Sequence, residues 1–567
     1  MKLRIILWAA LLAATPLQAR QTAPTPPHQA AIASANAYAT DAGLQVLAQG
    51  GNAFDAAVAV SATLGLVEPE SSGIGGGGLM LLHLANGQRE VFIDARERAP
   101  LAAHRDMFLG EQGKVRPRSS IDGPLAAAIP GLPAGLVHLS EKYGKLPLSK
   151  SLAPAIRLAR EGWQVSAKTA SMLPYRSEVM RSSPGAVELF FRDGKPVTAG
   201  QTLKNPDYAR TLELLARHGH DGFYRGELAE KLVRGVRAAG GLWSDEDFAQ
   251  YRVVEREPLR FSYRDYSLVT APPPSSGGVA LAEIFNILDG FDPADFELAD
   301  REHLAVEAMR RAYRDRAQYL GDPDFVAVPI PLLMSRDYAA GLRATIHPRK
   351  ATPSELLPPI EGLPSRPETT HFSVLDSDGN LAAVTQTVNL GFGNAFVVPG
   401  TGFVLNNEMD DFSVSPGVPN AFGLIGAEAN AIAPGKRPLS SMTPTLLFGK
   451  DKVAAIGTPG GSRIISMVMI GLLELMDGKG AQAASDAPRI HHQYQPDVVF
   501  AEPGALSEAQ IASLKSRGHT VKVLEDTWGN MQIVLWNRVT GEVEAGSDSR
   551  NKGIGKAALS APAAIYR

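Results

Sequence analysis

The sequence predicts an α+β fold in which two stacked β-sheets are covered by helices. Two candidate hairpins indicate the sheets. Strands at residues 79–84 and 90–93 flank the turn signal Asn86-Gly87, and strands at 372–375 and 381–388 flank a turn-prone segment. An apolar helix candidate accompanies the strands in each half of the chain. Strands and helices distributed in this way favour stacked sheets with outer helices.

The remaining elements follow in chain order. A helix rich in Ala, Val and Leu is expected at residues 55–66, after the turn-prone residues 50–52. A second pair of strands is expected at 444–448 and 453–456. Gly460 and Gly461 then lead into an apolar helix predicted over residues 462–476.

Composition describes an ordinary globular protein and excludes several classes. The chain has 567 residues, of which 44% are hydrophobic and 20% charged, so it can bury a large core. A net charge of −3 gives no electrostatic footprint for nucleic acid or an anionic membrane. With no cysteine in the sequence, neither disulfides nor thiol chemistry can operate.

The first residues are typical of an export signal. Lys2 and Arg4 form a basic start, residues 5–14 are apolar, and Ala19 is a small residue suited to a signal peptidase. We therefore predict a signal peptide over residues 1–19 and a periplasmic or secreted protein. A membrane anchor is the alternative, although the apolar run is short for a span of ~30 Å. No later segment is apolar for long enough to cross a membrane.

A proline-rich segment separates the two halves. Residues 351–368 hold five prolines and little that could pack, so we expect a solvated linker. The chain then changes at Thr369 to a strand pattern. Taken alone, this arrangement indicates a domain boundary.

Eight motifs are spread over nearly the whole chain. They are GGNAFDAA (50–57), GIGGGG (73–78), PPPSSGG (272–278), YLGDPDF (319–325), TTH (369–371), LNNEMDDF (405–412), KRPLSSM (436–442) and PGGSR (459–463). With these motifs in this order, the sequence resembles the gamma-glutamyltransferases of the N-terminal-nucleophile hydrolase superfamily, and the ordered set is far more specific than any one motif.

The resemblance implies a four-layer αββα sandwich made of two subunits from one precursor. The heavy subunit would be residues 20–368 and the light catalytic subunit residues 369–567. Cleavage between Glu368 and Thr369 would expose the α-amine of Thr369. Since an α-amine has a pKa of ~7.7–8.0, it can take the proton of its own threonine hydroxyl, which is otherwise a poor nucleophile.

Three further residues are assigned to catalysis by the resemblance. Thr387 matches the threonine that hydrogen-bonds the nucleophile. Gly460 and Gly461 match the oxyanion hole, where preorganised N–H donors are worth ~2.7–4 kcal/mol each. The glycine run at residues 75–78 lacks the context of a phosphate loop, and we interpret it as close backbone packing near the floor of the site.

The donor offers two charged handles, because a γ-glutamyl group keeps its α-carboxylate and α-ammonium free. Arginine binds carboxylates in a bidentate manner, and hydroxyls can add donors. The resemblance assigns the carboxylate to Arg96, Ser440 and Ser441. It assigns the ammonium to Asn389, Glu408 and Asp411.

Two positions depart from the common family pattern. The segment 413–427 resembles a lid loop, and the aligned gate residue is Phe422 where tyrosine is common, so a gate hydroxyl is missing. Position 408 is glutamate where some bacterial members have glutamine. The pair His491-His492 lacks a third ligand-like partner, so we predict no metal there, and the resemblance calls for no cofactor.

The expected enzyme cleaves γ-glutamyl amides such as glutathione and passes the glutamyl group to water, amino acids or peptides. Expected partners are therefore these small molecules and the two subunits of the precursor, without nucleic acid or a membrane span in the mature chain. One alternative is a cephalosporin acylase of the same superfamily acting on glutaryl amides. Another is an exported binding protein that has lost catalysis and stays uncut.

Overall fold

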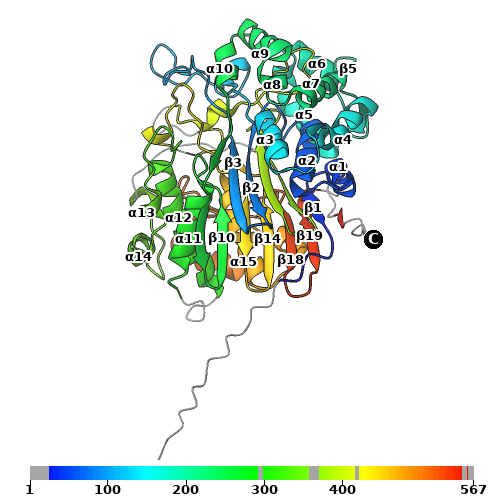
Figure 1. The fold of residues 1–567 in the computed structure, drawn as a ribbon. Helices are drawn as coiled ribbons and strands as arrows, with labels where there is room; N and C mark the ends of the chain where they lie inside the picture. Colours follow the sequence, from blue (N-terminus) through cyan, green and yellow to red (C-terminus); the bar gives the residue numbers. More distant parts are fainter. Residues whose placement is uncertain are drawn as a thin grey trace, which may run out of the picture.

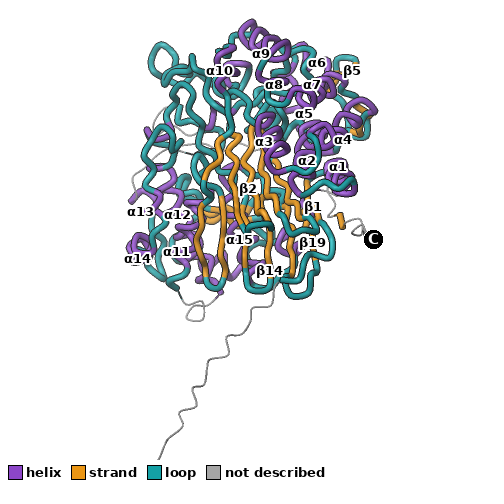
Figure 2. The backbone as a smooth tube through the Cα atoms, viewed as in Figure 1, coloured by secondary structure: helices purple, strands orange, loops and turns teal. Residues whose placement is uncertain are grey.

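Two β-sheets form the centre of the molecule. The computed structural model describes residues 24–291, 298–356, 369–414, 420–424, 426–551 and 558–559. Figure 1 shows the strands in the middle with helices around them, and Figure 2 shows the same layers by secondary structure. The predicted signal peptide, Glu368 and most of the linker lie outside the described residues.

The first sheet has seven strands in the order β20-β1-β11-β12-β2-β3-β8. Its central strands β11 and β12 follow Thr369 in the sequence, whereas β1, β2, β3 and β8 precede it. The strands are β1 (Ala31–Ser34), β2 (Gly77–Leu84), β3 (Arg89–Ala95), β8 (Val254–Arg256), β11 (Thr370–Leu375), β12 (Leu381–Thr387) and β20 (Ala558–Leu559).

The second sheet has six strands in the order β19-β18-β14-β13-β10-β9, all antiparallel to their neighbours. It too combines strands from before and after Thr369. The strands are β9 (Leu259–Tyr263), β10 (Tyr266–Thr270), β13 (Thr445–Phe448), β14 (Lys452–Gly457), β18 (Gln532–Asn537) and β19 (Val543–Ser547).

Helices cover the outer face of each sheet and complete four layers. On the first sheet lie α1 (Ala37–Ala48), α2 (Ala53–Val67) and α3 (Leu132–Tyr143). On the second sheet lie α11 (Gly277–Leu288) and α15 (Ile464–Met476), with α12 (Leu298–Tyr319) packed against α11. The observed fold is therefore the predicted αββα sandwich.

The strands β1, β2, β11 and β12 of the first sheet are buried on both faces, which explains their largely apolar sequences. In β2, Leu79 and Leu81 point toward the second sheet, while Met80 and Leu82 point toward the helices. The two hydrophobic cores therefore lie on either side of this sheet. No described helix is both long enough and apolar enough to be a membrane span.

The predicted elements are confirmed with small shifts at their ends. The expected strand 381–388 ends at Thr387, because the chain turns at Asn389, whose φ is +77°. The expected helix 462–476 begins as a 3₁₀ turn, Gly461–Arg463, and becomes α-helical at Ile464. The hairpin around Asn86-Gly87 is present as β2 paired with β3.

The prediction of a solvated linker is wrong for its first residues. Ser354 is fully buried, and its backbone N–H donates to Asp497 at 2.7 Å. The Thr352 N–H donates to Glu307 of α12 at 3.0 Å, and the Ala351 N–H to the Arg517 carbonyl at 2.7 Å. Polar groups on α12 and near the C-terminus therefore hold the start of this segment, a contact that its proline content did not reveal.

Two histidines lie beside the polar groups that hold the start of this segment. His303 of α12 and His519 share a hydrogen bond of 2.8 Å between Nδ1 and Nε2, and the other His303 nitrogen contacts the His347 carbonyl at 2.9 Å. Although His303, Glu307 and His519 lie close enough to hold a metal ion, the Glu307 oxygens already accept from Arg311 and Thr352. The arrangement is that of a hydrogen-bonded polar cluster.

Candidate active site

Strand register brings Thr369 and Thr387 together. In β11 and β12, Thr370 pairs with Gln386 and His371 with Thr385, so continuing the ladder by one residue places Thr369 opposite Thr387. Their hydroxyl oxygens lie 3.2 Å apart, and both residues are buried. Because side chains alternate along a strand, both threonines face the space between the sheets.

The backbone packs closely around Thr387. A Cβ added to Gly76 would lie 2.0 Å from the Thr387 carbonyl oxygen, so this position cannot carry a side chain without moving the strand. Thr387 Oγ1 in turn accepts the Asn389 N–H at 2.8 Å, and Asn389 Nδ2 donates to the Asn407 carbonyl at 2.9 Å. The glycine run therefore provides the predicted close packing beside the site.

Gly460 and Gly461 form a tight turn between β14 and the helical segment. Gly460 has φ +143° and ψ 15°, a conformation available to glycine alone, and Gly461 has φ +55°. Tyr313 of α12 donates its hydroxyl to the Ser462 carbonyl, one residue further. Gly461 lines the same cavity as Thr369, as the predicted oxyanion-hole role requires.

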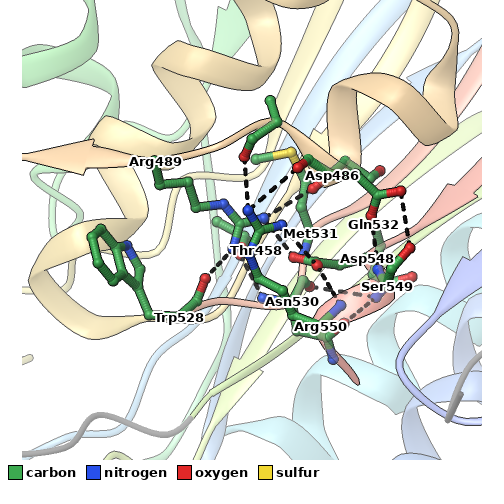
Figure 3. Close-up of polar contacts among 12 residues, drawn as sticks. Thr458, Asp486, Arg489, Trp528, Asn530, Met531, Gln532, Asp548, Ser549 and Arg550 are labelled. Carbon is green, nitrogen blue, oxygen red and sulfur yellow. Dashed lines mark hydrogen bonds and ion pairs between the residues drawn. The ribbon is translucent and has the colours of Figure 1, made fainter. Parts of the chain in front are cut away.

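A buried ionic network supports the residues before this turn (Figure 3). Arg489 and Arg550 both contact the carboxylate of Asp548, which also accepts the Met531 N–H at 3.0 Å. Beside it, the Asn530 N–H donates to Thr458 Oγ1 at 3.2 Å. Thr458 immediately precedes Pro459 and Gly460, so the network fixes the strand from which the glycine turn departs.

Arg96 lies at the centre of a buried charge cluster. Its guanidinium contacts Glu408, and it contacts Asp411 at 2.5 Å and Glu97 at 3.4 Å. Its Nε donates to the Pro438 carbonyl at 3.1 Å. The residue predicted to bind the donor carboxylate and two residues predicted to bind the ammonium thus pair with one another in this structure.

The cluster carries more carboxylates than cations, and this shifts its pKa values. Burial lowers the pKa of Arg96, but Glu408, Glu97 and Asp411 outweigh burial, and the net shift is upward. Burial raises the pKa of Glu97 to about 7 despite Arg96. Burial likewise raises the pKa of Asp411, and that of Glu408 more strongly. One oxygen each of Glu97 and Glu408 is buried with no hydrogen-bond partner among the described residues.

Ser440 and Ser441 are held by the segment that follows β10. The Ser440 N–H donates to the Pro274 carbonyl at 2.7 Å, and the Ser440 carbonyl accepts both the N–H and the hydroxyl of Ser276, each at 2.8 Å. Arg316, near the end of α12, donates to Ser276 Oγ at 3.0 Å and to Ser441 Oγ at 3.3 Å. Both serines are therefore fixed by residues from the first half of the chain.

All but one of the predicted donor-binding and catalytic residues line a single cavity. Its volume is about 20 Å³, room for roughly one water molecule. Phe422, the residue predicted to belong to a lid, lies in its wall, and residues 415–419 and 425 of that loop lie outside the described residues. The lining residues are Arg96, Thr369, Thr387, Asn389, Glu408, Asp411, Phe422, Leu424, Ser440, Ser441, Met442, Gly461 and Ile464. Gly460 adjoins this set through Gly461.

Sequence reasoning missed three contributors. Glu97 adjoins Arg96 in the sequence and could have been noticed for that reason. Arg316 and Tyr313 lie among many charged and polar residues of α12, and no sequence signal separates them from that background. Contacts across the fold reveal them.

Comparisons with known proteins agree with the geometry. The sequence model of the gamma-glutamyltranspeptidases matches residues 39–558. A glutathione hydrolase proenzyme of Escherichia coli (strain K12) is 41% identical over 570 residues, covering 97% of this chain and 98% of that protein. The structure of a cephalosporin acylase from Bacillus halodurans superposes with a TM-score of 0.81 at 28% identity, covering 98% of this chain and 99% of the other. That of a Helicobacter pylori gamma-glutamyltranspeptidase gives 0.55 at 40% identity, covering 57% and 93% respectively.

Proposed function

Because the chain belongs to the gamma-glutamyltranspeptidase family, we propose that it is a self-processing enzyme that cleaves γ-glutamyl amides, with glutathione as the first donor to test. The reaction would transfer the glutamyl group to water or to the amine of an amino acid or peptide. The observation that carries this proposal is the meeting of a threonine pair with charges of both signs in one small cavity.

Catalysis would begin with cleavage of the peptide bond between Glu368 and Thr369. In the uncut chain the nitrogen of Thr369 is an amide and cannot act as a base, whereas in the cut chain it is a free amine. The Thr369 hydroxyl would then attack the γ-carbonyl of the donor and pass its proton through that amine to the leaving nitrogen. An ester of Thr369 and a free amine result, Cys-Gly in the case of glutathione. Water attacks this ester to give glutamate, and an acceptor amine gives a transfer product.

The tetrahedral intermediate places negative charge on the former carbonyl oxygen. Backbone N–H groups at Gly460 and Gly461 are suited to receive it, since their turn is fixed by Tyr313 and by the network behind Thr458. Thr387 would orient the nucleophile through the hydroxyl contact of 3.2 Å.

Donor recognition would use both charges of the γ-glutamyl group. Its α-carboxylate would lie beside Arg96, Ser440 and Ser441, and its α-ammonium beside Asn389, Glu408 and Asp411. The buried oxygen of Glu408 that has no hydrogen-bond partner among the described residues is an acceptor that an ammonium N–H can satisfy. A donor would have to separate Arg96 from these acids, and it brings the opposite charges needed to replace both contacts.

The cavity of about 20 Å³ is too small for a glutamyl group, so we infer that the wall containing Phe422 opens for the donor. Asn420 holds this wall, donating to Asp411 at 3.2 Å and accepting the Phe422 N–H at 3.0 Å. The wall therefore contacts Asp411, one of the two acids proposed to bind the ammonium.

Glutaryl amide hydrolysis is the second candidate, because the cephalosporin acylase superposes over nearly the whole chain. A glutaryl group lacks the ammonium and would leave the carboxylates around Arg96 without a second cation. Comparing γ-glutamyl and glutaryl p-nitroanilides decides between the two candidate functions, and a higher kcat/KM for the glutaryl compound would contradict our proposal.

Processing is tested by denaturing electrophoresis and N-terminal sequencing. We expect two pieces, the smaller beginning at Thr369, and a single uncut chain from Thr369→Ala. A wild-type protein that remains whole and inactive would instead support the binding-protein alternative. Export is a separate proposal: fractionation should place the protein in the periplasm, with residues 1–19 removed from the larger piece.

A further inference from the structure

We propose that Arg316 is a positioning residue for donor binding, which orients the hydroxyls that receive the α-carboxylate and adds positive charge behind them. This inference rests on the proposed function and assigns a role to a heavy-chain residue outside the predicted site. Arg316 belongs to the last turn of α12, whereas both serines belong to the second half of the chain.

Burial without a counter-ion is the first observation. Arg316 is 5% exposed. Among the described residues, no carboxylate lies within ion-pair distance of the Arg316 guanidinium. Its Nη1 donates no hydrogen bond to any described residue. Burial lowers the pKa of Arg316 to about 10, so the side chain still carries its charge near neutral pH. A buried guanidinium without a counter-ion lowers the stability of the fold. Because this one lies beside a ligand cavity, we infer that it is kept for ligand binding.

The hydrogen bonds of Arg316 reach both serines. Its Nε donates to Ser276 Oγ at 3.0 Å, and this hydroxyl donates onward to the Ser440 carbonyl at 2.8 Å. Its Nη2 donates to Ser441 Oγ at 3.3 Å. One rigid guanidinium thus determines the placement of two neighbouring residues in the cavity wall.

Hydroxyl chemistry explains the effect on a donor. Ser441 Oγ accepts from Arg316, so its own proton is directed away from the guanidinium. That proton is then available to an acceptor inside the cavity. A carboxylate is the acceptor that such a site favours, because a charged N–H behind the hydroxyl strengthens the bond it donates.

Charge completes the argument. Arg96, the cation expected to meet the donor carboxylate, is already surrounded by Glu97, Glu408 and Asp411. The charge of Arg316 also acts on Asp411 and lowers the pKa of that carboxyl against the upward effect of burial. A second cation reduces the repulsion that an incoming carboxylate would meet from these acids.

The test compares three p-nitroanilides that differ by one charged group. They are the γ-glutamyl compound, the glutaryl compound without the ammonium, and the 4-aminobutyryl compound without the carboxylate. Arg316→Gln removes the charge but keeps hydrogen-bonding atoms. Arg316→Lys keeps the charge but loses the planar set of N–H donors that reaches both Ser276 and Ser441. Arg314→Gln on the same helix is the control.

For Arg316→Gln we expect KM for the two carboxylate-bearing compounds to rise at least about tenfold, with kcat changed less than about threefold. The 4-aminobutyryl compound should be unaffected, and Arg316→Lys should recover part of the loss. An equal rise in KM for all three compounds, or no change in KM for any of them, would overturn the inference.

Each comparison is internal to one variant, so a reduced yield of folded protein does not affect it. If Arg316→Gln does not accumulate, KM for the three compounds is measured with Arg316→Lys instead. A rise in KM confined to the carboxylate-bearing compounds would then support the inference, and an equal rise for all three would overturn it. A wild-type enzyme that ignores the γ-glutamyl compound refutes the proposed function itself. A wild type that uses it, with a variant of unchanged KM, refutes only the role of Arg316.

Discussion

Thr369 and Thr387 face one another across the ladder of β11 and β12, with their hydroxyl oxygens 3.2 Å apart. The second threonine also receives the Asn389 N–H at 2.8 Å, so one hydroxyl connects the proposed nucleophile to the turn at Asn389, which we propose contacts the donor. Loss of this hydroxyl should affect orientation rather than packing.

Replacement of Thr387 by valine keeps the shape and removes the hydrogen bonds. We expect kcat of the processed enzyme to fall about tenfold or more, since two buried hydrogen bonds are lost. Thr387→Ser keeps the hydroxyl and should retain most activity. Steady-state kinetics on γ-glutamyl p-nitroanilide, normalised to the cleaved fraction on gels, provides the measurement. Equal activity of the valine and wild-type enzymes would exclude this role.

Gly460→Ala should impair the proposed oxyanion hole. At φ +143° an alanine is strained, whereas the nearby methyl of Met467 can move aside, so the backbone conformation is the cause of the effect. We expect kcat to fall about a hundredfold, as for loss of one oxyanion donor. Gly478→Ala is the matched control, because Gly478 also has positive φ (+89°) but open space around it. Similar kcat values for both variants would refute the prediction.

Selectivity between donors should depend on pH through Glu97. Burial raises its pKa to about 7, so the group is mainly protonated below this value and ionised above it. Ionised Glu97 favours a donor ammonium. The ratio of kcat/KM for γ-glutamyl over glutaryl p-nitroanilide should therefore increase from pH 6 to pH 8.

The ratio cancels titration of the Thr369 amine, which affects both compounds alike. Glu97→Gln should flatten the dependence. A wild-type ratio that stays constant, or that decreases with pH, would be incompatible with this account.

Acid should destabilise the polar cluster that anchors the start of the linker. Burial lowers the pKa of His519 from 6.5 to about 3, so the unfolded chain binds a proton in this range that the folded chain excludes. The contribution of His519 to the free energy of unfolding is therefore complete above pH 6.5 and is lost as the pH falls toward 3. His519→Gln should be less stable than wild type at pH 7, with a difference that narrows at pH 4.5.

Urea unfolding midpoints of the two uncut proteins, each carrying Thr369→Ala, measure this difference. A gap of constant size at both pH values would show that protonation of His519 does not contribute.

Much of the fold follows from local sequence. The β2–β3 hairpin was predictable because Asn86-Gly87 fixes the turn and the flanking residues form strands. The helix after Gly461 was predictable from its apolar length. The start of the linker was not, because the partners of Ser354 lie far from it in the sequence, Arg310 by 44 residues and Asp497 by 143.

The site was predictable as a set of residues but not as a set of contacts. Motifs indicated Arg96, Glu408 and Asp411 separately, while their mutual pairing depends on contacts between the segment after β3 and a 3₁₀ turn more than three hundred residues later. Arg316 lacks any local signal, since a buried arginine and a solvated one look alike in sequence.

The mixed origin of the strands has a consequence for assembly. Strands β11 and β12 lie between β1 and β2, and β10 pairs with β13, so each sheet is completed by both sides of Thr369. If the chain is cut there, the two pieces remain joined by hydrogen-bonded ladders and cannot separate without exposing strand edges. A continuous chain, by contrast, brings these strands together at the high effective concentration of a tether. Maturation would then report that folding is complete, because the cavity around Thr369 is lined by Arg96 from before the cut and by residues after it, and it forms only when both parts of the chain have packed together.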